Sequence, residues 1–228
     1  VSLNWESTSG KLWYVTAGRY FAMPSFYQMF YADSYGYSLP NPELKPEKGW
    51  TYDIGVKDEK AKNPWNIGLF YMDMEDKINY VYDASFVGQY VNVDKYRAWG
   101  IEAKVKFNLS DEWSYTQQLT FTDADEKVQN GDWTRSEQPR WAASGFLNYK
   151  SGPWLAEVAM NYYGDRVIKS TVYSDEDIFT MNASLAWKEN NHTLRFACNN
   201  IFDKEFYLNK DGYIIPERRF IFSWEYNF

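Results

Sequence analysis

An alternation of apolar and polar residues with a period of two is the feature that most constrains the fold of this chain. The segment 99–107 shows it plainly, since Trp99, Ile101, Ala103, Val105 and Phe107 alternate with Gly100, Glu102, Lys104 and Lys106. Successive side chains of a β-strand point to opposite faces. The pattern therefore predicts strands with one apolar and one polar face, rather than helices.

The composition indicates what the apolar face contacts. Aromatic residues make up 20% of the chain although its mean hydropathy is −0.62. No stretch approaches the run of about 20 apolar residues that a membrane-spanning helix needs. Trp or Tyr recurs near strand ends, where amphipathic rings prefer the membrane–water boundary. This combination is typical of a transmembrane β-barrel, whose strands show one face to lipid.

The pattern predicts an all-β fold of about eleven antiparallel strands. We expect them at 1–7, 11–20, 50–58, 64–74, 96–108, 112–123, 140–150, 153–164, 177–188, 191–199 and 217–228. An odd number cannot close into an antiparallel barrel, because the first and last strands would then run parallel. Eleven is half of the about 22 strands of plugged outer-membrane transporters. The sequence therefore predicts half of such a barrel.

The connections between the expected strands alternate strictly in length. The short ones are 8–10, 59–63, 109–111, 151–152 and 189–190, and the long ones are 21–49, 75–95, 124–139, 165–176 and 200–216. Outer-membrane barrels have tight periplasmic turns and long extracellular loops. The alternation predicts the outer membrane as the location, with the final strand ending on the periplasmic side.

The last strand has the most pronounced apolar face, formed by Phe220, Phe222, Trp224, Tyr226 and Phe228. Such an aromatic row would promote aggregation in water. We expect it to face lipid. Cys198 falls on the lipid-facing row of its own strand and is interpreted as a small apolar residue.

Charge and reactive residues exclude several functions. The net charge of −7 argues against a nucleic-acid partner. The chain has one Cys and one His, and His192 lies beside a predicted periplasmic turn without a nucleophile nearby. We therefore predict no catalytic residues, no cofactor and no metal site. The many acidic residues of the long loops make a calcium site conceivable, but their spacing matches no calcium motif and favours solvated charge.

Three blocks of sequence resemble the β-barrel of TonB-dependent receptors. The first is the segment 18–27, with Phe21, Pro24 and Ser25 matching the family motif and Ala22 departing from it. The second and most specific is Asn41-Pro42-Glu43-Leu44-Lys45-Pro46-Glu47. The third is the segment 199–207, with Asn200, Phe202 and Asp203, leading to the C-terminal Phe228. The final aromatic strand also resembles the signal that the outer-membrane assembly machinery recognises.

These blocks have a physical interpretation beside the resemblance. The residue before each proline of the second block is pushed out of the helical region, which predicts an extended lead-in to a strand. Lys45 and Glu47 could form ion pairs there. Asn200 and Asp203 favour turns. A fold-stabilising role is the favoured interpretation of both blocks.

The resemblance implies that residues 1–228 are the C-terminal part of the barrel of a receptor that imports an iron chelate such as a siderophore, haem, cobalamin or a similar nutrient. Its partners would be outer-membrane lipid, the remaining barrel half, an extracellular small-molecule ligand and an N-terminal plug domain. The plug and the TonB box, through which the TonB complex acts, are absent from this sequence.

The loop 21–49 contains the candidate ligand-binding residues Tyr27, Tyr31, Tyr35 and Tyr37. Tyrosine offers a stacking surface and a hydroxyl group, which suit a planar or catecholate ligand. Packing within the loop or an aromatic girdle is the favoured alternative.

Two other functions stay open. A self-contained small outer-membrane barrel, either an enzyme or a porin-like channel, would need an even strand number. A soluble carbohydrate-binding β-sandwich would not need loops that alternate in length.

Overall fold

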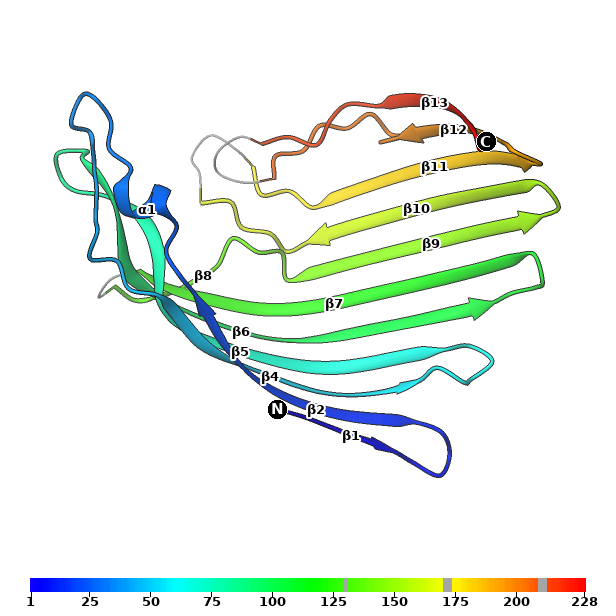
Figure 1. The fold of residues 1–228 in the computed structure, drawn as a ribbon, viewed down its shortest axis with the longest axis horizontal. Helices are drawn as coiled ribbons and strands as arrows, with labels where there is room; N and C mark the ends of the chain where they lie inside the picture. Colours follow the sequence, from blue (N-terminus) through cyan, green and yellow to red (C-terminus); the bar gives the residue numbers. More distant parts are fainter. Residues whose placement is uncertain (129–130, 170–173, 209–212) are drawn as a thin grey trace.

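The computed structural model describes residues 1–128, 131–169, 174–208 and 213–228, and its strands form one open sheet (Figure 1). Eleven strands follow one another in the order β1-β2-β4-β5-β6-β7-β9-β10-β11-β12-β13, each antiparallel to the next. Their bounds are β1 (Ser2–Glu6), β2 (Leu12–Ala22), β4 (Glu47–Asp58), β5 (Trp65–Tyr82), β6 (Gly88–Asn108), β7 (Trp113–Val128), β9 (Trp141–Ser151), β10 (Trp154–Gly164), β11 (Ile178–Glu189), β12 (His192–Asn199) and β13 (Arg219–Tyr226).

The predicted number and order of strands are confirmed. Two short strands lie off this path: β3 (Ser38–Leu39) pairs in parallel with β6, and β8 (Trp133–Arg135) pairs with β7. Within the described ranges the edge strands β1 and β13 have no partner on their outer sides. The sheet is therefore neither a closed small barrel nor two packed layers, which excludes the β-sandwich.

The two faces of the sheet differ as the alternation predicts. Tyr52, Tyr71 and Trp99 lie side by side on β4, β5 and β6, with 46%, 43% and 48% of their surface exposed. This apolar face continues to β13, where Phe222 pairs with Phe196 of β12. Opposite it is the polar face, which carries Lys104, Lys106 and their neighbours.

The two ends of the sheet also differ. Short turns connect the strands at the end drawn on the right in Figure 1, which we call the turn end. The opposite end, the loop end, carries the connections that contain α1 (Phe26–Phe30), β3 and β8. Among the described residues, no helix is long and apolar enough to span a membrane.

The prediction that the lengths of the connections alternate strictly is wrong at one place. The segment 75–95 was expected to be a long loop, but β5 extends to Tyr82 and β6 begins at Gly88. The alternation continues there in Ile78, Tyr80 and Tyr82, and these β-prone side chains favour a strand. The acidic residues of the segment made it look like a loop, although Glu75 and Asp76 lie within β5.

A small cluster of buried side chains lies on the polar face towards the loop end. Tyr96, Ala98 and Ala124 are its buried members, and Phe70, Met72 and Met74 pack against them. Phe70 lies across Gly100 of the neighbouring strand, where a Cβ atom would collide with its ring. Glycine thus leaves room for an aromatic ring to lie flat on the sheet.

Candidate functional site

Two segments meet at the loop end, where the candidate ligand-binding residues lie. The first is the connection 23–46, which contains α1 and β3. The second is the finger, which we define as residues 77–92, where β5 and β6 continue beyond the rest of the sheet. Ser38 pairs with Gly88 and Leu39 with Gln89, so the connection is joined to the finger.

A capping box starts the helix of this connection. The Ser25 hydroxyl accepts a hydrogen bond from the Gln28 backbone N–H at 3.2 Å, and the Gln28 side chain accepts one from the Ser25 N–H at 2.8 Å. A loop was expected here, and α1 was not predicted. The signal was present, because Ser followed three residues later by Gln is a capping box.

Five tyrosine rings come together between the connection and the finger. We call Tyr27, Tyr31, Tyr80, Tyr82 and Tyr90 the tyrosine cluster. Ring centroids are 4.6 Å apart for Tyr27 and Tyr31, 6.1 Å for Tyr27 and Tyr90, 4.8 Å for Tyr80 and Tyr90, and 5.2 Å for Tyr80 and Tyr82. The Tyr80 hydroxyl donates to the Ser38 hydroxyl at 2.7 Å, which ties the finger to β3.

The four tyrosines expected to bind ligand are placed differently. Tyr27 and Tyr31 lie in the tyrosine cluster, whereas Tyr35 and Tyr37 lie outside it and are 85% and 63% exposed. Their backbone N–H groups both donate to the Asp33 carboxylate, at 2.8 and 3.0 Å. The residues predicted to bind ligand did not include Tyr80, Tyr82 and Tyr90. Continued alternation through 78–82 was the signal that could have placed Tyr80 and Tyr82 on a strand.

Tyr31 shows that hydroxyl groups converge within the cluster. The pKa of Tyr31 is raised above its ordinary value, mainly by the charge interaction with Tyr27, with further contributions from burial, Tyr80 and Asp33. The Tyr31 hydroxyl thus lies near that of Tyr27 within the cluster.

The block Asn41–Glu47 attaches the connection to the finger. The Asn41 side chain donates to the Tyr90 carbonyl at 2.8 Å. Asn92 forms two hydrogen bonds with the backbone of Lys45, at 2.7 and 2.8 Å, and Leu44 is buried. Pro42 and Pro46 keep the chain extended between these contacts. These contacts agree with the favoured fold-stabilising interpretation of the block.

Glu47 ends the block at a β-bulge. The register of β5 and β6 shifts between Met74 and Lys77, and again between Lys77 and Ile78. The Glu47 carboxylate accepts a hydrogen bond from the Ile78 N–H at 2.8 Å and one from the Tyr20 hydroxyl at 3.0 Å. The expected ion pairs of Lys45 and Glu47 are not found among the described residues. The Glu47 carboxylate binds the Tyr20 hydroxyl and the Ile78 N–H instead.

Several acidic residues of the loop end are paired with cations. Arg135 and Arg140 both contact Asp165, at 2.7 and 3.3 Å, and Arg140 also contacts Asp123 at 2.8 Å. The pKa of Asp165 is lowered, first by its hydrogen bond from Arg135. In the described part of the chain, no three or more His, Cys, Asp or Glu are placed to hold a metal ion.

The third block forms a turn, as its residues predict. Asn200 and Asp203 have positive φ angles of 50° and 54°. The buried Asn200 side chain donates to the carbonyls of Lys204 and Pro216, at 2.8 and 3.0 Å. Asp203 pairs with Arg218 at 3.1 Å, and the ring of Phe202 packs on Phe179.

Of the three residues of the first block that match the family motif, Ser25 caps α1. Phe21 lies one residue before the end of β2 with 60% of its surface exposed, and Pro24 directly precedes the capping residue. The block therefore marks where a strand passes into the helix.

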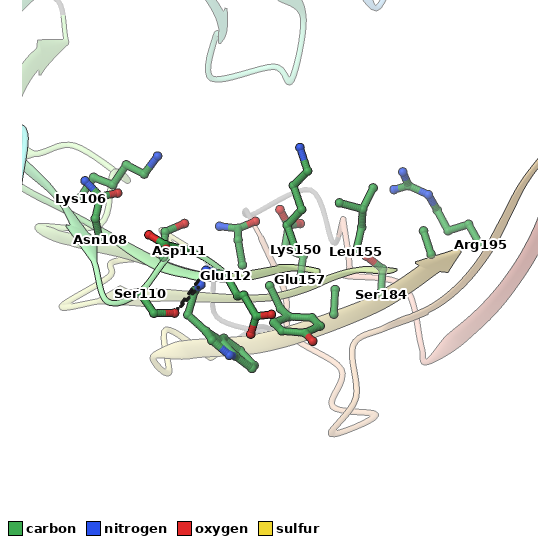
Figure 2. Close-up of a pocket in the computed structure, with 16 residues that line it drawn as sticks. Lys106, Asn108, Ser110, Asp111, Glu112, Lys150, Leu155, Glu157, Ser184 and Arg195 are labelled. Atoms are coloured by element: carbon green, nitrogen blue, oxygen red, sulfur yellow. Dashed lines mark hydrogen bonds between the residues drawn. The ribbon is translucent and has the colours of Figure 1, made fainter. Parts of the chain in front are cut away.

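The polar face near the turn end forms an open cavity of about 480 Å³ (Figure 2). Lys106, Lys150, Glu157 and Arg195 extend into it from four different strands, and no ion pair is formed by any of them within the described residues. This surface can receive a polar or charged partner.

The aromatic residues of the last strand lie on the apolar face. Phe220, Phe222, Trp224 and Tyr226 pair with Cys198, Phe196, Leu194 and His192 on the apolar face. Phe228 lies beyond β13 and packs edge-on against Tyr226. The His192 imidazole nitrogen Nδ1 accepts a hydrogen bond from Trp224 at 3.2 Å. This contact occupies the single histidine in packing at the turn end.

Comparison with known proteins gives consistent results. Residues 1–201 match the family described as TonB-dependent receptor-like, β-barrel. The chain is similar to the vitamin B12 transporter BtuB of Photobacterium profundum, with 26% identity over 93% of this chain and 34% of the relative. It is also similar to the ferripyoverdine receptor of Pseudomonas aeruginosa, with 22% identity over 86% of this chain and 27% of the relative.

Solved structures share the fold. The copper transporter OprC superposes with a TM-score of 0.80 at 19% identity, over 99% of this chain and 38% of that protein. These relatives are named as transporters and receptors, not as enzymes. The chain spans about a third of their length.

Proposed function

Because the chain belongs to the TonB-dependent receptor β-barrel family, whose members are integral outer-membrane proteins, we propose that it is the C-terminal part of the barrel of a nutrient importer. The observation that carries this proposal is a sheet of eleven strands with an apolar outer face, whose two edges need further strands to close. The apolar face contacts lipid, and the polar face lines the lumen.

The remaining barrel strands and a plug domain complete the receptor in this proposal. An even total requires the remaining part to supply an odd number of strands. The charges of Lys106, Lys150, Glu157 and Arg195, which form no ion pair with the described residues, suit a polar plug in the lumen, and the TonB complex would act on that plug. The loop end lies outside the cell and the turn end in the periplasm.

The ligand is a small nutrient such as an iron chelate, haem or cobalamin, and the tyrosines of the connection contact it. Tyr27, Tyr31, Tyr35 and Tyr37 stand at the loop end, where a ligand arrives. Two of them are more than 60% exposed, which leaves their rings available for stacking.

Uptake by cells tests this proposal. The full-length receptor is returned to cells that lack it, and uptake of ⁵⁵Fe-loaded siderophores, haem and radiolabelled cobalamin is measured with and without TonB. We expect TonB-dependent uptake of one of these nutrients. Uptake of none of them, or uptake that persists without TonB, would contradict the proposal.

A triple variant tests the ligand contact separately. Replacing Tyr31, Tyr35 and Tyr37 with Ala is expected to reduce uptake while the barrel stays folded. Tyr213→Ala, which changes an exposed tyrosine of another loop-end segment, serves as the control. Normal uptake by the triple variant would show that these rings do not contact ligand.

A further inference from the structure

We propose that the tyrosine cluster and the carboxylates beside it select a flat, positively charged ligand over a polyanionic one. This inference rests on the proposed import function and narrows its ligand class. It follows from three features of the loop end. These are the arrangement of the tyrosine rings, the contacts of five arginines with aspartates or backbone carbonyls, and the position of two carboxylates.

Three of the four neighbouring ring pairs of the cluster stand at steep angles, and Tyr27 and Tyr31 are inclined by 31°. The planes of Tyr80 and Tyr82 are inclined by 88°, those of Tyr27 and Tyr90 by 69°, and those of Tyr80 and Tyr90 by 63°. Tyr27 and Tyr82 are 58% and 66% exposed. Such rings present negative faces to solvent in more than one direction, and these faces attract cations.

Five arginines of the loop end are already engaged. Arginine is the side chain best suited to bind carboxylates, phosphates and similar anions through paired hydrogen bonds. Arg97, Arg135, Arg140 and Arg218 each contact an aspartate. Arg166 is buried and donates to the carbonyls of Glu176, Tyr207 and Leu208. None of these five is free to hold an anionic ligand.

Two of the three lysines near the cluster are paired as well, whereas Lys45 has no acidic partner among the described residues. Lys48 contacts Asp76 at 2.9 Å, and Lys77 approaches Glu126 at 3.8 Å. The segments 23–48 and 76–92 together contain five acidic residues, three lysines and no arginine. The surroundings of the tyrosine cluster are therefore short of cations.

Two carboxylates beside the cluster are not compensated by a cation. Asp33 accepts from the N–H groups of Tyr35 and Tyr37, and Asp83, at the tip of the finger, accepts from those of Ser85 and Val87. Neither has a cationic side-chain partner in the described ranges. The charge of Asp33 also contributes to the raised pKa of the Tyr31 hydroxyl group.

The loop end as a whole also carries an excess of negative charge. The loop-end segments contain 21 acidic and 14 basic residues, and the rest of the chain contains 10 of each. These segments are 21–49, 73–97, 123–140, 165–177 and 201–219. The whole net charge of −7 thus belongs to the loop end, where it attracts cations and repels polyanions.

A pair of probes with the same shape and opposite charge tests this proposal. One is an iron porphyrin with four N-methylpyridinium groups, and the other is an iron porphyrin with four sulfonated phenyl groups. Binding of each to the purified full-length receptor in detergent is followed by absorbance. We expect the cationic porphyrin to bind at least about tenfold more tightly at low salt, and this ratio to shrink as ionic strength rises.

Variants distinguish binding of the cationic porphyrin at the tyrosine cluster from its unspecific attraction to the negative charge of the receptor. Tyr80→Ala, and Asp33→Asn with Asp83→Asn, should each weaken binding of the cationic probe about threefold or more. Tyr213→Ala and Asp132→Asn should leave it unchanged. Equal affinity for the two probes, tighter binding of the anionic one, or equal effects of cluster and control variants would overturn the proposal. None of these results would contradict the import function, because uptake in cells is measured with other ligands.

Discussion

The Glu47 side chain stabilises the β-bulge at the base of the finger. Its carboxylate accepts hydrogen bonds from Tyr20 and from the backbone of Ile78, at the bulge where the finger leaves the sheet. A bulge leaves backbone groups without their ladder partners, and a buried N–H without an acceptor is costly. Glu47 provides that acceptor.

Replacing Glu47 with Ala should therefore loosen the finger. We expect a local loss of about 1–3 kcal/mol, since the Ile78 N–H loses its acceptor. Faster hydrogen exchange of the backbone amides in segment 76–92 of the full-length receptor would report this loss of local stability. Glu47→Gln keeps one acceptor oxygen and should have a smaller effect, and Glu43→Ala, at an exposed position, should have none. Unchanged exchange in Glu47→Ala would show that the bulge does not depend on this side chain.

Asp165 should make the loop after β10 sensitive to acid. Its pKa lies below the ordinary value of 3.8, so its contacts with Arg135 and Arg140 add stability above that value. That stability is lost as pH falls through the lowered pKa. We expect proteolysis of segment 165–169 in the purified receptor to be constant from pH 7 down to about pH 5 and to increase as the pH falls below about 4.

The Asp165→Asn variant should be cut readily at every pH in this range. Asn tolerates the positive φ angle of 51° at this position, so the backbone is preserved. Asp132→Asn, at an exposed acid, should behave like the natural protein. A loop that resists cleavage in Asp165→Asn would show that these ion pairs do not hold it.

Single residues also show the limit of prediction from sequence. Tyr27 and Tyr31 could be proposed as ligand contacts because they lie in an aromatic loop. Tyr80 and Tyr90 could not be joined to them, because their meeting depends on a bulge and on the contacts of Asn41 and Asn92 with distant backbone. Such contacts bridge more than 40 residues and leave no local pattern.

At the scale of elements, the finger and the sheet should be separable. The finger is attached through β3, Asn41 and Asn92, whereas the sheet below is held by its own ladders. Replacing residues 79–91 with a short Gly-Ser turn should leave a folded barrel that no longer takes up its ligand. Heat-modifiable migration on gels reports the barrel, and uptake reports the site. Normal uptake would show that the finger is dispensable.

Gly100 tests the packing of neighbouring strands. A Cβ atom there would collide with the Phe70 ring and the Phe121 carbonyl, and the carbonyl cannot move without breaking the ladder. Gly100→Ala should cost about 1–3 kcal/mol and lower the temperature at which the barrel unfolds in detergent. Gly18→Ala, where only the Thr51 hydroxyl lies close at 3.1 Å, is the matched control. Equal unfolding temperatures would contradict this account of the packing.

The elements themselves were largely predictable, since a period of two fixes which residues share a face. Strand bounds at the turn end, such as those of β9 and β10, agree with the expected segments within a residue or so. At the loop end the prediction failed for 75–95 and missed α1. Charged residues there lie within strands, as Glu75 and Asp76 do in β5, so polarity no longer marks the end of a strand.

At the scale of the whole molecule, the two faces and the two ends set the orientation in the membrane. The apolar face from β1 to β13 fits lipid, and the odd number of strands requires a further odd number to close the barrel. Family membership places this barrel in the outer membrane. The central claim is that the loop end faces outward and the turn end faces the periplasm.

Cysteine labelling in intact cells tests this claim most directly. In full-length receptor with Cys198→Ala, single substitutions Ser34→Cys and Ala84→Cys mark the loop end, and Ser9→Cys and Asp111→Cys mark the turn end; all four positions are exposed. A maleimide that cannot cross the outer membrane should label the first two in intact cells, and the last two only after the cells are broken. Labelling of Ser9→Cys or Asp111→Cys in intact cells, with Ser34→Cys and Ala84→Cys protected, would contradict the account.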